Sequence, residues 1–131
     1  MPIPTELLAT ITDRLTPNGG PATANHATSV WACVFARFDP LIGPLSTQVL
    51  FARTLALHED IFPWLPQALT PDQARQVFDT FTRALDGLQE DDLLAANRTL
   101  LTSYSTQLAE LIGARLATQF LRSAFPPDAT R

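Results

Sequence analysis

Histidine and acidic side chains are the groups of this chain that could bind a metal ion or transfer protons. The two histidines, His26 and His58, have no second histidine three or four residues away, as a helical zinc site requires. In His58-Glu59-Asp60, consecutive helical residues point about 100° apart and do not converge on one ion. We therefore predict no metal site. We expect His58 at a helix C-terminus, where an imidazolium interacts favourably with the dipole, and His26 at a helix start.

Cys33 is the single cysteine and a candidate nucleophile. It lies within the apolar run Trp31–Phe35, where burial would keep the thiol inert. The hydroxyl residues of segment 99–106 lack the glycines of a nucleophile elbow, and Gly19-Gly20 is typical of a turn rather than of a phosphate-binding loop. We predict no catalytic residue and no cofactor. This favours a non-enzymatic protein and leaves an enzyme as the third possibility.

Asn97 is the polar member of an otherwise apolar helical seam. Leucines recur every seven residues at 94, 101 and 108, and a second series runs through Asn97, Tyr104 and Leu111. A buried amide must find hydrogen-bond partners, so Asn97 either fixes the register against another helix or faces water at the edge of the seam. A functional hypothesis is that Asn97, Tyr104 and Trp31 line a pocket for a mostly apolar ligand.

The connector 61–66, which contains Pro63 and Pro66, is the candidate protein-binding segment. Four large apolar residues, Ile61, Phe62, Trp64 and Leu65, occur within five positions. If they were exposed, they would form a hot spot for a protein partner. The alternative is that this segment folds back over its own helices.

Helical spacing of apolar residues predicts the elements that position these side chains. In 71–88 the apolar residues follow at steps of three and one, and Thr70 is a suitable N-cap. A long helix is predicted from about 91 to 112, with acidic residues at its start, and a final helix from about 114 to 124. Gly113 separates these two helices.

The first half has a less regular pattern. Apolar residues between 7 and 15 indicate an opening helix, and 17–21 is a turn rich in proline and glycine. A helix from about 26 to 38 is apolar on nearly all sides, as in the middle of a bundle, and Asp39-Pro40 is expected to end it. Another helix is predicted from about 44 to 58. No segment alternates like a strand, so the predicted fold class is all-α, with about six helices in a compact bundle.

The two halves of the chain resemble each other at an offset of 70 residues. Segment 9–15 matches 79–85 at two threonines and a leucine, and Leu-Ile-Gly occurs at both 41–43 and 111–113. After a shift of one residue, 45–50 matches 116–121 at four of six positions. Amphipathic helices resemble one another at many offsets, so the apolar matches prove little, whereas amphipathicity does not demand the polar ones.

Length and composition fit one domain, 1–131. With 46% hydrophobic and 17% charged residues, the chain is too apolar to stay disordered. We predict two three-helix repeats, about 1–68 and about 70–131, packed around a pseudo-twofold axis. The apolar surplus is concentrated in the first half, so we expect a partner surface there.

The charge balance argues against a nucleic-acid partner. Nine basic residues are spread among thirteen acidic ones, for a net charge of −4. The longest apolar run, Trp31–Ala36, has six residues, against about 20 needed to cross a bilayer, so no membrane insertion is expected. The first residues carry no signal-peptide pattern, which predicts a cytoplasmic protein.

These observations predict a cytoplasmic regulatory or adaptor module that binds a protein through its helices, or binds a second copy of itself as a homodimer. The basis is an apolar content that leaves hydrophobic surface to be covered. The alternative is a helical sensor domain that binds a mostly apolar small molecule between the two repeats.

Overall fold

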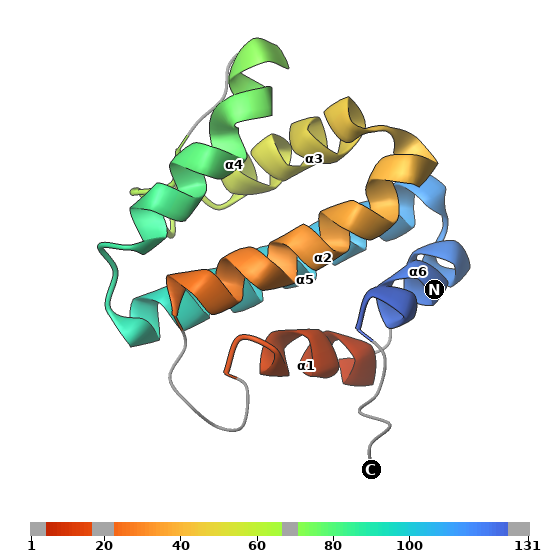
Figure 1. Cartoon of the computed structure of the whole chain (residues 1–131), viewed down its shortest axis with the longest axis horizontal. Coiled ribbons are helices and arrows are strands. Elements are labelled where there is room, and N and C mark those ends of the chain that lie inside the picture. Colours follow the sequence, from red (N-terminus) through yellow and green to blue (C-terminus); the bar gives the residue numbers. More distant parts are fainter. Residues whose placement is uncertain (1–4, 17–22, 67–70, 126–131) are drawn as a thin grey trace.

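Six helices and no strand make up the part of the chain that the computed structural model describes, residues 5–16, 23–66 and 71–125 (Figure 1). The predicted all-α bundle is confirmed. The N-cap expected at Thr70 and the turn expected at 17–21 lie outside the described residues. The helices are α1 (Thr5–Asp13), α2 (Ala24–Ile42), α3 (Pro44–Leu57), α4 (Pro71–Leu85), α5 (Glu90–Ile112) and α6 (Ala114–Ala124).

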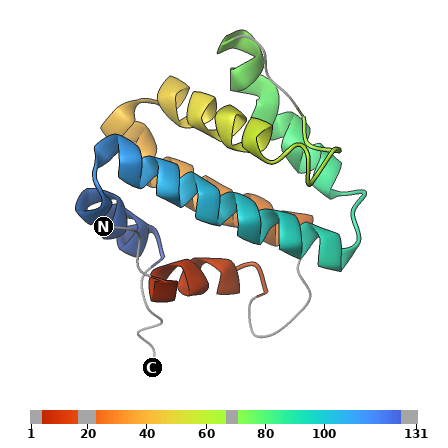
Figure 2. The ribbon, with the colours of Figure 1, turned by 180° about the vertical axis from the view of Figure 1, so that it is seen from behind.

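The two longest helices, α2 and α5, lie side by side at the centre and run in the same direction (Figures 1 and 2). Helices α3 and α4 pack together on one side of this central pair, and α1 and α6 lie on the other. Each outer pair combines one helix from each half of the chain. None of the helices in the described ranges is both long and apolar enough to cross a membrane.

Two glycines turn the chain sharply at the same end of the central pair. Gly43, between α2 and α3, has φ 94° and ψ 145°, and Gly113, between α5 and α6, has φ 95° and ψ 142°. Each glycine N–H donates to the carbonyl four residues earlier, that of Asp39 at 2.9 Å and that of Ala109 at 2.8 Å. Residues with a Cβ rarely adopt this backbone region. We call these two glycine turns the elbows.

Burial follows the 70-residue offset through all six helices. Twelve of the fifteen buried residues described in the first half have a buried residue 70 positions later. Hydroxyl hydrogen bonds repeat as well, since Thr10 and Thr80 each donate to the carbonyl four residues earlier. The twelve residues are Leu7, Ile11, Leu15, Ala27, Val30, Trp31, Val34, Phe35, Phe38, Thr47, Phe51 and Leu55.

In α3 and α6 the offset between buried positions differs by one residue from the offset of the sequence match, which pairs 45–50 with 116–121. Buried Thr47 and Phe51 correspond to buried Ala117 and Leu121, which keeps the offset at 70. The four identities between 45–50 and 116–121 are therefore out of structural register and give no support to a duplication. The duplication and its pseudo-twofold axis stay predictions.

Helix α2 differs from the sequence expectation at its C-terminal end and on its outer face. It does not end at Asp39-Pro40 but continues through the proline to Ile42. Proline removes the N–H that would reach the carbonyl of Ala36 and crowds that carbonyl, and Ala36 is exposed, so water can solvate the displaced oxygen. The expected position of this helix in the middle of the bundle is confirmed, although its apolar residues Ala32, Cys33 and Ala36 face outward.

An aromatic cluster fills the centre between α2, α3, α4 and α5. The Trp31 ring lies 4.8 Å from Phe51 and 5.4 Å from Tyr104 between centroids, with both pairs edge to face. Phe81 from α4 approaches Phe51 at 5.2 Å. Such pairs stabilise a core by about 0.5–1.5 kcal/mol each beyond the burial of their area. Residues from both halves of the chain therefore share one core.

The elbows generate a stability prediction. A Cβ added at Gly43 or Gly113 would meet no atom within 4 Å, so substitution by alanine costs backbone strain alone. Gly43→Ala and Gly113→Ala should each lower the free energy of unfolding by about 1–3 kcal/mol in urea denaturation. The control is Gly87→Ala, at a glycine without positive φ, which should change stability by less than about 0.5 kcal/mol. Equal effects at all three glycines would contradict the elbow conformation.

Candidate binding sites

A hydrogen bond between two fully buried side chains joins the central helices. Trp31 Nε1 donates to Asn97 Oδ1 at 2.9 Å, and Asn97 Nδ2 donates to the carbonyl of Leu93 at 2.8 Å. The amide oxygen thus has a partner on α2, and the amide nitrogen has one on its own helix. Because the partner of Trp31 is a single atom, the bond fixes the register of α2 against α5.

A second polar contact ties α5 to the first elbow. The buried Tyr104 hydroxyl donates to the carbonyl of Thr47 at 3.0 Å, and the Thr47 hydroxyl donates to the Asp39 carboxylate. Burial, and to a lesser degree the Asp39 carboxylate, raises the pKa of Tyr104 far above its usual range. Tyr104 is therefore a neutral hydrogen-bond donor in the folded protein.

The three residues predicted to line a ligand pocket are brought together by the fold. Trp31, Asn97 and Tyr104 lie in contact within the core, and each is at most 1% exposed. Their polar groups bond to one another or to the backbone, and three surface pockets formed by described residues are lined by other side chains. The geometry favours the interpretation of Asn97 as a register-fixing residue, and the sensor function stays a prediction.

The proline-framed connector packs largely against its own bundle. Leu65 is buried, and Trp64 stacks on Phe81 of α4 with 6.2 Å between ring centroids. Phe62 is half-buried against the core, whereas Ile61 is 65% exposed. Of the four residues predicted to bind a partner, Ile61 alone presents most of its side chain to solvent.

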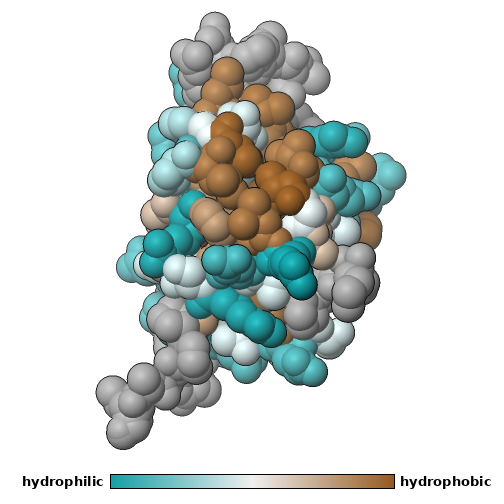
Figure 3. Space-filling model, turned by 90° about the vertical axis from the view of Figure 1, so that its right-hand side faces the viewer, coloured by the Kyte–Doolittle hydropathy of each residue, from teal (hydrophilic) through white to brown (hydrophobic). Residues whose placement is uncertain are grey.

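The sequence did not single out the apolar surface beside the elbows. Leu41, Leu45, Val49 and Leu111 are between 39% and 59% exposed. Leu41 and Leu111 each lie two residues before an elbow glycine, and both elbows lie at the same end of the molecule. Figure 3 shows apolar side chains gathered into one patch on that end. We call these four residues the elbow patch.

The elbow patch belongs mainly to the first half. At the positions equivalent to Leu45 and Val49, the second half has the exposed polar residues Arg115 and Gln119. Five of the six exposed large hydrophobic residues described in the structure precede residue 70. Exposed large hydrophobic residues are thus concentrated in the first half, and a partner surface there stays a prediction. A signal was present in the sequence, because 45 and 49 are spaced by four on α3 while the buried face of this helix runs through Thr47, Phe51 and Leu55.

Three surface pockets in the described part of the chain include charged side chains, histidine or cysteine. The first, of about 280 Å³ between α1 and α6, is lined by Glu6, Leu7, Thr10, Arg122 and Phe125. The second, of about 250 Å³, includes His26 and Cys33, and the third, of about 400 Å³, includes His58 and Arg98.

Two expectations about reactive residues have different outcomes. Cys33 is exposed, so the prediction of a buried thiol was wrong; the 3.6-residue period turns position 33 away from the buried face of α2. His58 does lie at the C-terminal cap of α3, as predicted. The two histidines line separate pockets, and within the described ranges no group of three or more His, Cys, Asp or Glu residues could hold a metal ion.

The Trp31–Asn97 bond generates a second stability prediction. Asn97→Ala leaves the buried Trp31 N–H without a partner and creates a cavity, so unfolding free energy should fall by about 2–4 kcal/mol. The control Thr106→Ala, at an exposed position of the same helix, should change it by less than about 0.5 kcal/mol. Urea denaturation followed by circular dichroism measures both. A cost for Asn97→Ala as small as that for Thr106→Ala would contradict the bond.

Tyr104 generates a prediction about pH. Its pKa is raised on folding, so above about pH 10 the unfolded chain loses the tyrosine proton while the folded chain keeps it. The buried Tyr104 hydroxyl therefore stabilises the fold fully below about pH 10. Above that pH the free energy of unfolding falls by up to about 1.4 kcal/mol per pH unit.

Tyr104 is the single tyrosine, so tyrosinate absorbance reports its ionisation directly. That absorbance should appear only as the protein unfolds in alkali. Tyr104→Phe should remove this part of the pH dependence. Ionisation near pH 10 in the folded state would contradict the buried hydrogen bond.

Comparison of the chain with protein-family models, curated proteins and solved structures gave no match. The function is therefore argued from the elbow patch, the pockets and the buried polar contacts.

Proposed function

We propose that this protein is a non-enzymatic regulatory or adaptor module that binds protein through the elbow patch, and that the occupant of the patch is a second copy of the chain. The proposal is supported by the apolar patch on the elbow end of the bundle and by the exposure of the four aliphatic residues beside the elbows. Contiguous apolar surface of this kind is typical of interaction sites. The proposed location is the cytoplasm.

The surface beneath the patch is held rigidly. Leu41 and Leu45 flank Gly43, and the bonds from Tyr104 to Thr47 and from Thr47 to Asp39 anchor this elbow to α5. A surface that is already ordered loses little conformational entropy when a partner docks. A preformed patch therefore supports association without a folding step.

Charges beside the patch support a second copy as the occupant. The exposed Glu110 precedes Leu111, and the exposed Arg115 lies two residues beyond the elbow glycine Gly113. In a twofold contact each surface meets its own copy, so a border of one sign would repel itself. A border with both signs allows acid to meet base across the contact. Burial of a half-exposed aliphatic side chain contributes about 1 kcal/mol, and four such residues on each copy, set against the entropy lost on association, support a reversible dimer rather than an obligate one.

Sedimentation of a double variant tests the proposal. Leu45→Arg with Val49→Gln installs the residues that α6 carries at its equivalent positions, so the helix should still form. The wild type should form a detectable dimer by about 100 μM. In the double variant the dissociation constant of the dimer should rise by at least about tenfold.

Leu57→Arg is the matched control. Leu57 is 60% exposed on the same helix but lies outside the elbow patch. This variant should dimerise like the wild type. A wild type that stays monomeric at about 100 μM, or an equal loss in Leu57→Arg, would overturn the proposal. Circular dichroism verifies that all three proteins are folded.

A further inference from the structure

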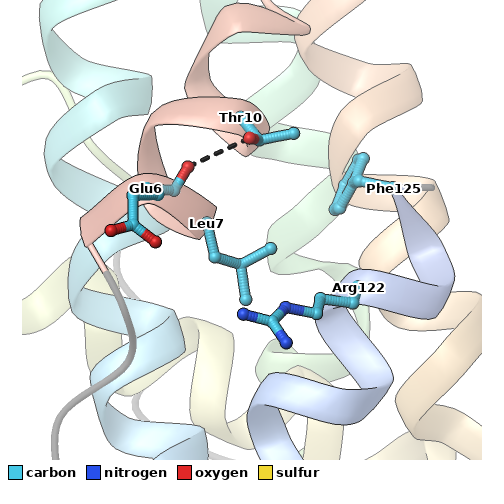
Figure 4. Close-up of a pocket in the computed structure, with 5 residues that line it drawn as sticks. All are labelled: Glu6, Leu7, Thr10, Arg122 and Phe125. Atoms are coloured by element: carbon cyan, nitrogen blue, oxygen red, sulfur yellow. Dashed lines mark hydrogen bonds between the residues drawn. The ribbon is translucent and has the colours of Figure 1, made fainter. Parts of the chain in front are cut away.

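The pocket between α1 and α6 combines an apolar floor with two opposite charges. Leu7 and Phe125, both nearly buried, form its floor, and Glu6 and Arg122 lie exposed at its border (Figure 4). Figure 4 shows the Leu7 side chain between the Glu6 carboxylate and the Arg122 guanidinium. The Thr10 hydroxyl donates to the backbone carbonyl of Glu6 at 3.0 Å. Glu6 and Arg122 thus line one pocket from two different helices.

The equivalent groove in the other outer pair has a different composition. The residue 70 positions after Glu6 is Gln76, and the residue 70 positions before Arg122 is Ala52. Ala52 is buried, and α3 packs extensively against α4, whereas α1 and α6 contact each other less. Both charges are therefore present where the groove is open and absent where it is closed by packing.

The charge pattern selects the kind of ligand. A simple anion at Arg122 would meet repulsion from Glu6, and a simple cation at Glu6 would meet repulsion from Arg122. A molecule with one charge of each sign satisfies both groups, and an apolar body between its charges would cover Leu7 and Phe125. The volume of about 280 Å³ limits the ligand to roughly the size of an amino acid.

We propose that the pocket between α1 and α6 binds a small zwitterion with an apolar body, its ammonium group at Glu6 and its carboxylate at Arg122. An α-amino acid with an aliphatic side chain and an ω-amino acid with an alkyl chain share this chemistry. The site is distinct from the core residues Trp31, Asn97 and Tyr104. It is also independent of the proposed dimer, because none of its lining residues belongs to the elbow patch.

Titration followed by ¹H–¹⁵N NMR tests the ligand class on the full chain. The probes are L-leucine for the α-amino acids and 6-aminohexanoate for the ω-amino acids. Saturable shifts of the Leu7, Thr10 and Phe125 amides with one of these probes identify which source fits. The controls are 4-methylpentanoate, which lacks the ammonium group, and leucinamide, which lacks the carboxylate. Each control should bind at least about fivefold more weakly than the zwitterion.

Two variants taken from the equivalent groove test the residues. Glu6→Gln and Arg122→Ala install the residues found at 76 and 52. The mutated positions, 6 and 122, are both exposed, so the fold should persist. Each variant should weaken zwitterion binding at least about fivefold, and Glu6→Gln should bind 4-methylpentanoate no more weakly than the wild type does.

The same titrations define the contrary results. Absence of a saturable shift with both zwitterions up to about 10 mM would overturn the proposal. Equal binding of the zwitterion and the singly charged controls, or unchanged affinity in both variants, would overturn it too. Sedimentation of the same variants should show wild-type dimerisation, which keeps failure of this site distinguishable from failure of the proposed dimer.

Discussion

The hydrogen bond from Trp31 to Asn97 is the contact around which the bundle is organised. It joins the two central helices inside an aromatic core, where an unpaired indole N–H or amide would be costly. Apolar packing alone allows neighbouring helices to slide by a turn with little change in buried area. A single donor and acceptor, both shielded from water, allow one register. That register places both elbows at one end of the molecule and lets each outer pair form from one helix of each half.

The two halves share a frame but present different surfaces. Both have the same elbow conformation and nearly the same pattern of buried positions. Outward positions are free of that constraint, since an exposed side chain does little to hold the core. In the first half they carry Leu45 and Val49, and in the second half Arg115 and Gln119. The differences between the halves therefore lie at outward positions, where the two proposed binding surfaces are found.

Local sequence patterns alone do not determine where the candidate site residues lie in the fold. The apolar connector was recognised, but an apolar segment is equally suited to a partner and to its own bundle, and Trp64 found a stacking partner on α4. Cys33 was assigned to the interior because its neighbours are apolar, although a helix exposes some positions of any apolar run. Glu6 and Arg122 lie 116 residues apart, so no local pattern relates them.

Local periodicity and glycine chemistry determined the helices and their breaks. Steps of three and four residues select one face of a helix, and a helix cannot continue through the conformation of Gly43 or Gly113. Those are short-range effects, so the sequence by itself was sufficient to predict the six helices, although not the end of α2, which continues through Pro40 to Ile42. Which faces meet depends on contacts between residues tens of positions apart, such as Trp31 with Asn97. Only the tertiary structure therefore decided that the polar seam residue is an interior hydrogen-bond partner, that the elbows share one end, and that opposite charges from the first and last helices border one pocket.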